Sequence, residues 1–143
     1  MPLRPLRRIG VRSSPAGPSA DRASGFRAKV SAIEAQPKAL EVTTLRALSS
    51  MGSGSSTGAG LASALKIRST EIRQRITELN FQAAGPAGQV LDPVRSRGEG
   101  NLDGIEASVC NAAPNYFWRR AMSIYGGSNE IQRNIVAKHV LGL

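Results

Sequence analysis

The stretch IYGGSNEIQR, residues 124–133, determines how this chain ends. Two glycines stand directly before Ser128, and serine caps a helix by accepting a hydrogen bond from a backbone N–H of the first turn. An acidic residue follows in that turn, and basic residues come near the end of the segment, as the dipole of a helix favours. We therefore predict a helix from Ser128 to Leu141, which the chain enters through a turn at Gly126 and Gly127.

The same turn has the features of a binding site for an anion. Glycine has no Cβ, so a ligand can approach its backbone closely. The N–H groups at the start of a helix have no partner within the helix and, together with the dipole, favour an anionic group such as a phosphate. The polar side chains of Ser128, Asn129 and Glu130 could contact a nucleotide there. A plain turn between two packed helices is the alternative, because Gly-Gly before a helix cap is common.

Helical periodicity extends through much of the chain before this turn. Residues 26–50 have an apolar face that is interrupted by Pro37, which predicts a kink or two shorter helices. Another helix is predicted over residues 59–84, and Gly85 and Pro86 end it with a left-handed cap and a residue that cannot continue. The predicted apolar faces consist of Val30, Ile33, Leu40, Leu45 and Leu48 in the first segment and of Leu61, Leu65, Ile72, Ile76 and Leu79 in the second.

The segments between these helices are more polar. Residues 51–58, MGSGSSTG, read as a flexible connector. Residues 87–111 show no periodicity and read as a surface loop, which at this length is expected to be functional or ordered by a partner. A third helix is predicted from residues 113–115 to just before Gly126. Since no strand pattern persists, we predict an all-α fold, an antiparallel up-down bundle of about four helices over residues 26–143.

Positive charge gathers at the N-terminal end. The formal net charge is +9, and residues 1–27 contribute +5 of it through six arginines and one aspartate. Residues 1–25 are rich in Pro, Gly, Ser and Arg without an apolar pattern, so we predict a disordered basic tail. An organelle transit peptide, a nucleic-acid-binding arm and a start outside the natural chain are alternatives for this segment. No apolar run reaches the roughly 18 residues that span a bilayer.

The single cysteine and the single histidine give little support for a disulfide or a metal site. Cys110 is the only cysteine, which excludes an intrachain disulfide and fits the reducing cytoplasm. His139 is the only histidine, and no other ligand types cluster with it in the sequence, so we expect no metal site. Arg119 and Arg120 could contact an anion such as a CoA phosphate, or they could lie on a solvated or ion-paired face; both interpretations stay open.

The string SIYGGSNEIQRNIVAKHVLGL, residues 123–143, resembles the C-terminal signature of acyl-CoA dehydrogenases. The string ALKIRSTEIRQRITELNFQAAG, residues 64–85, resembles the helix before the last two in that family, and residues 26–50 fit the helix before it. Members are FAD enzymes of fatty acid metabolism that oxidise an acyl-CoA to the 2,3-enoyl-CoA. The resemblance therefore implies FAD as cofactor, acyl-CoA as substrate and an electron-transfer flavoprotein as electron acceptor. It also implies a homo- or hetero-oligomer, with no nucleic acid as partner.

The resemblance assigns roles to residues of this chain by position. Ser128, Asn129 and Glu130 match positions that contact FAD. Gly126 and Gly127 match backbone positions beside the reacting end of the acyl-CoA.

A second matching segment, residues 82–86, touches the FAD of a neighbouring subunit in the family. It makes Gln82 and Gly85 candidate cofactor contacts. The family often has Gly-Gly at its end, whereas this chain has Pro86, which lacks the N–H that such a contact would use.

No residue of this chain matches a catalytic base. In several members the catalytic glutamate follows the tyrosine of the last motif, and here that position is Gly126. Glu106 and Glu130 are nearby acids, but neither matches a family base position. We therefore expect no catalytic residue and no complete active site within these 143 residues. A non-catalytic interaction module that pairs with a fuller subunit is the rival hypothesis. A nucleic-acid binder is weaker, because the arginine excess lies in a segment without interleaved aromatics.

Overall fold

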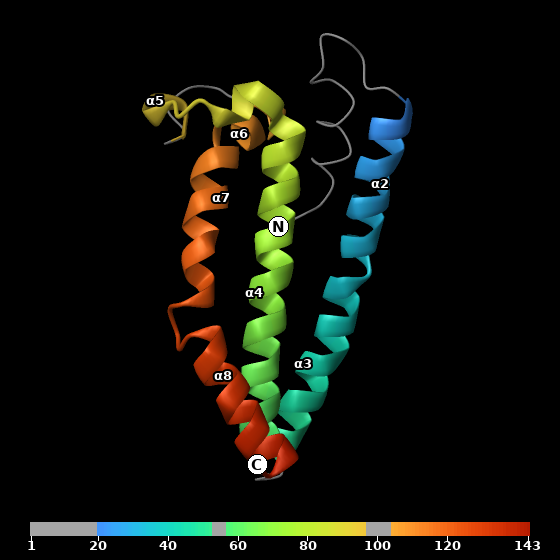
Figure 1. Cartoon of the computed structure of the whole chain (residues 1–143), viewed down its shortest axis with the longest axis vertical. Coiled ribbons are helices and arrows are strands. Elements are labelled where there is room, and N and C mark those ends of the chain that lie inside the picture. Colours follow the sequence, from blue (N-terminus) through green and yellow to red (C-terminus); the bar gives the residue numbers. More distant parts are fainter. Residues whose placement is uncertain (1–19, 53–56, 97–103) are drawn as a thin grey trace. The chain divides into compact units, whose positions relative to one another are not determined.

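Every regular element that the structure describes is a helix (Figure 1). The computed structural model describes residues 20–52, 57–96 and 104–143, and within these ranges there is no strand. The predicted all-α fold is therefore confirmed. The elements are α2 (Ala20–Glu34), α3 (Gln36–Gly52), α4 (Thr57–Ala84), η1 (Gly85–Gln89), α5 (Pro93–Ser96), α6 (Gly104–Cys110), α7 (Ala112–Arg120), η2 (Ala121–Ser123), α8 (Asn129–Val136) and η3 (Ala137–Leu141).

Pro37 divides the first helical region as the sequence predicts. α2 ends at Glu34 and α3 begins at Gln36, so Pro37 lies in the first turn of α3, where its missing N–H costs no helical hydrogen bond. The predicted start of this region at residue 26 is wrong, because α2 already begins at Ala20. A single glycine inside a helix costs only about 1 kcal/mol, so Gly25 does not end the helix. Residues 1–19 of the predicted tail lie outside the described residues.

The predicted apolar face holds for α2 and fails for α3. Val30 and Ile33 of α2 are buried, whereas Leu45 and Leu48 of α3 are 63% and 60% exposed. The buried residue of α3 is Ala47 instead. Periodicity identifies an apolar face of a helix, but it does not tell whether another element covers that face.

The chain forms two compact units, and α4 contributes to both. Of the described residues, one unit contains 20–34, 74–96 and 104–120, and the other contains 35–52, 57–73 and 121–143. In the first unit α7 runs antiparallel to the end of α4. Gln74 contacts Arg120 near the start of this pairing, and Phe81 stacks on Tyr116 further along it.

Gly88 allows close packing in the first unit. It lies in η1, directly after α4, and is buried. A Cβ at Gly88 would collide with the Cβ of Ala84 and would lie 3.3 Å from the Cβ of Ala112. The absence of a side chain at Gly88 therefore lets η1 fold back against the end of α4 and the start of α7.

The predicted loop over residues 87–111 is wrong for most of its length. It contains the end of η1, then α5 and α6, with residues 97–103 outside the described residues. The Oδ1 atom of Asp92 accepts a hydrogen bond from the backbone N–H of Val94 at 3.0 Å and so caps α5. Elements of four to seven residues are too short to show a helical period, which is why the pattern missed them. The predicted stop at Gly85 is confirmed, because its φ is +59°.

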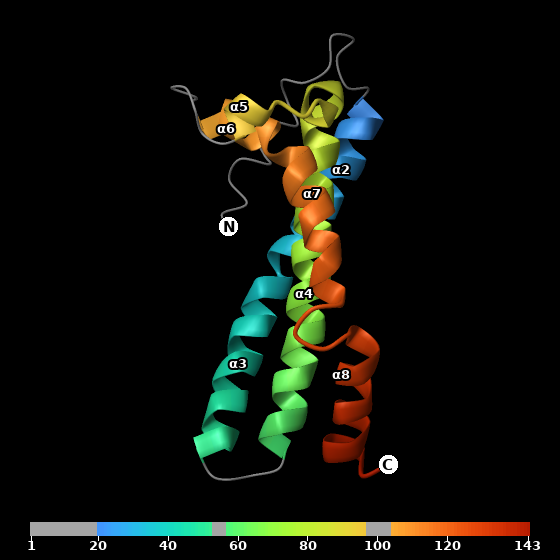
Figure 2. The same cartoon turned by 90° about the vertical axis from the view of Figure 1, so that its left-hand side faces the viewer.

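In the second unit α3 and α8 both lie beside the first half of α4 (Figure 2). Gly58 of α4 is buried against Met51 of α3; a Cβ there would lie 2.8 Å from the Met51 Cγ. Gly60 is buried against Val140 of η3, so the end of the chain packs on the start of α4. Of the predicted connector before α4, residues 53–56 lie outside the described residues.

Candidate functional site

The Gly126–Gly127 turn is formed by backbone conformations that only glycine adopts readily. The φ angles of Gly126 and Gly127 are +68° and +85°. The turn follows η2, where the N–H groups of Ile124 and Tyr125 both donate to the carbonyl of Ala121, at 2.9 and 3.1 Å. Both glycines are exposed, so the backbone of the turn is open to a ligand. A Cβ at Gly126 would have no neighbour within 4 Å.

Ser128 caps α8 as the sequence predicts. Its φ and ψ of −60° and 157° are extended, and its Oγ accepts a hydrogen bond from the Ile131 N–H at 3.4 Å. Its carbonyl accepts the first helical bond from the N–H of Gln132, at 2.9 Å. The predicted end at Gly142 is also confirmed, with a φ of +70°. The first turn of α8 thus begins directly after an exposed turn.

Two side chains bind the carbonyls of the paired glycines. The Nε2 of Gln132 donates to the Gly126 carbonyl at 3.1 Å, and the Nζ of Lys66 donates to the Gly127 carbonyl at 2.7 Å. Lys66 also donates to the Oδ1 of Asn129 at 3.0 Å, and Asn129 is only 9% exposed. The turn is therefore held from α8 on one side and from α4 on the other.

Lys66 is a site residue that the sequence reasoning missed. It lies outside the apolar face predicted for residues 59–84, yet it is half-buried and hydrogen-bonded to residues more than sixty positions away. The resemblance to a family also gave it no role. A lysine outside the apolar stripe carries no local signal of such a contact, because the contact depends on where α8 packs.

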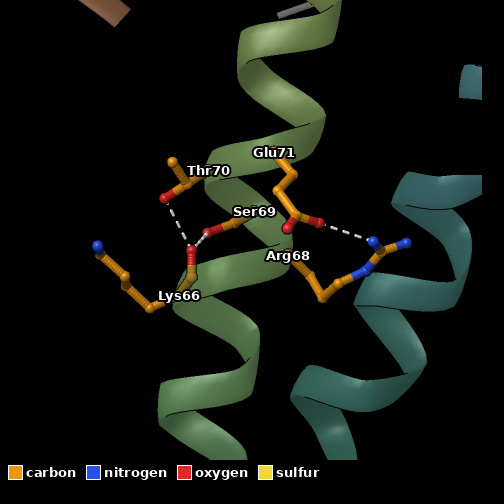
Figure 3. Close-up of polar contacts among 5 residues, drawn as sticks. All are labelled: Lys66, Arg68, Ser69, Thr70 and Glu71. Atoms are coloured by element: carbon orange, nitrogen blue, oxygen red, sulfur yellow. Dashed lines mark hydrogen bonds and ion pairs between the residues drawn. The ribbon is translucent and has the colours of Figure 1, made fainter. Parts of the chain in front are cut away.

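The backbone of Lys66 is held by its own helix (Figure 3). The hydroxyls of Ser69 and Thr70 both donate to the Lys66 carbonyl, at 3.0 and 2.8 Å, and Thr70 is 2% exposed. Arg68 and Glu71 form an ion pair at 2.7 Å on the other side of α4 from the Lys66 side chain. The Lys66 side chain thus leaves α4 on the side away from this ion pair, and its ammonium donates to the turn and to Asn129.

Glu130 is charged and exposed in the first turn of α8. Hydrogen bonds from its own backbone N–H and from the Ser128 hydroxyl lower the pKa of the Glu130 carboxyl from its ordinary value of 4.5, and the charges of Arg133 and Lys66 lower it further. The Arg133 Nη1 lies 3.8 Å from the Glu130 Oε1. An ionised carboxylate at this position also suits the positive end of the helix dipole.

The remaining candidate cofactor residues belong to the other compact unit. Gln82 is exposed near the end of α4, where its Nε2 donates to the Glu78 Oε1 at 3.4 Å. Gly85 follows in its left-handed conformation. The structure thus brings together the candidates from Gly126 to Glu130, whereas Gln82 and Gly85 belong to the unit that contains α7.

Arg120 has structural partners in this other unit. Its guanidinium carbon lies 4.5 Å from the centroid of the Tyr116 ring, and its Nη2 donates to the Gln74 carbonyl at 3.0 Å. Tyr116 also packs against Phe81, with ring centroids 4.9 Å apart. Trp118, on the same helix, is 68% exposed. Neither interpretation left open for this arginine named contacts of this kind, with a ring and a carbonyl, and contact of Arg119 or Arg120 with an anion stays a prediction.

The described residues contain no cluster of three or more His, Cys, Asp or Glu side chains that could bind a metal ion. Among the same residues no helix has both the length and the apolar character needed to cross a membrane. Cys110 is a half-buried free thiol, and His139 is exposed near the end of the chain.

Comparison with known proteins is consistent with the motif at the end of the chain. Two curated relatives, each named acyl-CoA dehydrogenase IpdE1, come from Mycobacterium tuberculosis and Mycolicibacterium smegmatis. Each is 71% identical to this chain over 28 residues, which is 20% of this chain and 7% of the relative. No solved structure matches the chain. Residues 18–141 match the family model described as "Acyl-CoA dehydrogenase, C-terminal domain". This match extends over most of the chain, which therefore belongs to the acyl-CoA dehydrogenase family.

Proposed function

We propose that this chain supplies the FAD-contacting part of the C-terminal bundle of an acyl-CoA dehydrogenase, which oxidises an acyl-CoA to the 2,3-enoyl-CoA. The observation that carries this proposal is the exposed Gly126–Gly127 turn, whose carbonyls are bound by side chains and which leads directly into the capped start of α8. The two units of the chain would each contribute residues to the same cofactor-dependent enzyme.

The residues at the start of α8 suit the phosphate-bearing half of FAD. The N–H groups of a helix start favour anions, and the Lys66 ammonium adds a positive charge at the same turn. Ser128, Asn129 and Glu130 would bind and orient the cofactor, and Gln82 and Gly85 would contact the FAD of a neighbouring subunit. FAD, when bound, supplies the acceptor for the hydride that leaves the acyl-CoA, and an electron-transfer flavoprotein would then take the electrons.

Gly126 and Gly127 would form the wall beside the reacting end of the acyl-CoA. The open space around Gly126, where a Cβ would meet nothing within 4 Å, supports this role. Glycine cannot remove a proton, so the base that takes the α proton would come from outside these residues. We therefore expect the 143 residues on their own to be inactive and to work with a β domain from outside these residues.

An interaction module is the second candidate function. On α3, exposed apolar side chains recur every three residues, so much of this helix offers apolar surface to a partner. A module of this kind would pair with a fuller acyl-CoA dehydrogenase subunit without doing chemistry itself. These side chains are Val42, Leu45, Leu48 and Met51, which are 53–63% exposed.

Purification and spectroscopy test both candidates. The first predicts that the 143-residue chain, mixed with a longer subunit of the same family, binds FAD and reduces an electron-accepting dye when given an acyl-CoA. In that mixture, replacing both Ser128 and Glu130 by alanine should weaken FAD binding. Unchanged FAD binding by this variant would contradict the proposed contact. Pairing that leaves the dye unreduced would favour the module, and dye reduction by the chain alone would overturn the expected inactivity.

A further inference from the structure

Lys66 joins two elements that are distant in the sequence. Its ammonium donates to the Gly127 carbonyl at 2.7 Å and to the Asn129 Oδ1 at 3.0 Å, so one side chain of α4 contacts both the turn and the first residue of α8. Hydrogen bonds from a charged donor are stronger than neutral ones, and this donor is half-buried. Lys66 therefore forms a strong link between these two elements.

The turn needs such a link because glycine has little conformational preference of its own. Gly126 and Gly127 can adopt many backbone conformations, and fixing them costs more entropy than fixing other residues. The hydrogen bond from Gln132 comes from α8 itself, so it moves with the helix. The bonds from Lys66 come from α4, so they fix the turn and Asn129 relative to a separate element of the same unit.

We propose that Lys66 is a positioning residue for the cofactor site. Its ammonium holds the Gly127 carbonyl and the Asn129 side chain, and this keeps the N–H groups at the start of α8 in one orientation. The inference rests on the proposed function, since it assigns the residue that prepares the same site. It goes beyond that function because Lys66 would act through the turn and Asn129 and need not touch the cofactor.

Hydrogen exchange measured by NMR on the full chain tests the positioning role without any cofactor. The reporter is the Gln132 N–H, which makes the first helical bond of α8 to the Ser128 carbonyl at 2.9 Å. Lys66→Met keeps the aliphatic stem and removes the donors, and we expect exchange at Gln132 to become about tenfold faster. Lys66→Arg, which keeps a charged donor, should restore most of the protection.

Lys38→Met is the matched control. Lys38 lies on α3 in the same unit and its side chain is 85% exposed, with only a 3.5 Å ion pair to Glu41. We expect it to leave exchange at Gln132 unchanged. Circular dichroism shows whether each variant keeps its helices. If Lys66→Met loses them, Lys66→Gln, which keeps a shorter donor, takes its place with the same expected direction.

FAD binding, followed by quenching of flavin fluorescence in the mixture with a longer subunit, gives the second readout. A roughly tenfold weaker affinity with Lys66→Met, partial recovery with Lys66→Arg and no change with Lys38→Met would support the proposal. Equal exchange at Gln132 and equal affinity in Lys66→Met and the unmodified chain would overturn it. If the unmodified chain adds nothing to FAD binding, the proposed function fails, while the exchange measurement still decides whether Lys66 positions the turn.

Discussion

Gln74 of α4 and Arg120 of α7 each donate hydrogen bonds from the side chain to backbone carbonyls of the other helix. The Gln74 Nε2 donates to the carbonyls of Arg119 and Arg120, at 3.1 and 3.3 Å, and the Arg120 Nη2 donates back to the Gln74 carbonyl at 3.0 Å. Gln74 thus donates to two carbonyls at the end of α7. This reciprocal contact joins α4 to α7 by polar bonds beside the stacked aromatic rings.

Removing the Gln74 amide should therefore destabilise the fold. We expect Gln74→Leu to lower the free energy of unfolding by about 1–2 kcal/mol, because both hydrogen bonds from the Gln74 amide to the end of α7 are lost. Urea denaturation followed by circular dichroism measures this value. Arg75→Leu, a change at the exposed neighbouring position, is the control and should alter stability by less than about 0.5 kcal/mol. Equal effects of the two substitutions would argue against the reciprocal contact.

Two glycines should respond to alanine with opposite signs. A Cβ at Gly88 would collide with Ala84 and press on Ala112, so Gly88→Ala should destabilise the protein by about 1–3 kcal/mol. Gly25 lies inside α2, and a Cβ there would meet nothing within 4 Å. Gly25→Ala should therefore stabilise the helix by up to about 1 kcal/mol. Thermal unfolding of both variants measures the contrast, and a stabilising effect at Gly88 would contradict the observed packing.

The two glycines of the turn should also differ from each other. Alanine at either position is strained by the positive φ, at a cost of roughly 1–2 kcal/mol. At Gly127 the new Cβ would additionally lie 2.6 Å from the Gln132 Nε2, so Gly127→Ala should cost more than Gly126→Ala. In a Gln132→Ala background this difference should shrink. A double-mutant cycle from chemical denaturation measures the coupling, and an unchanged difference would mean that Gln132 does not cover Gly127.

Acid should weaken the start of α8. The pKa of Glu130 is lowered by hydrogen bonds from its own backbone N–H and from Ser128. A lowered pKa in the folded state means that the charged carboxylate stabilises the fold above its ordinary pKa of 4.5, and that this contribution is lost as the pH falls through the lower folded value. Carbon-detected NMR titration should place the Glu130 pKa below 4.5, and Ser128→Ala should raise it. Glu130→Gln should remove this part of the pH dependence of stability.

Local signals in the sequence predicted the ends of helices well. Pro37, Gly85, Ser128 and Gly142 act through their own backbone or through a neighbour three residues away, so a short window of sequence contains the whole cause. The short helices α5 and α6 lacked this advantage, since a helix of four to seven residues has almost no period to detect.

Contacts between distant segments could not be read in the same way. The bonds that Lys66 makes depend on which face of α4 packs against α8. The sequence of neither helix shows this face. The exposure of Leu45 and Leu48 has a related cause. An apolar face is visible in the sequence of a helix, but the element that would pack on this face is not. The candidates from Gly126 to Glu130 came from the local pattern of the turn and from resemblance to a family, and their contact with a cofactor stays a prediction.

The exposed indole of Trp118 gives the protein its own optical reporter. It is the only tryptophan in the chain, so the indole emission comes from one known place on α7. In water this emission should lie at long wavelength, and any subunit or cofactor that covers the ring would shift or quench it. Assembly could thus be followed in the natural protein, with no dye attached and no residue replaced.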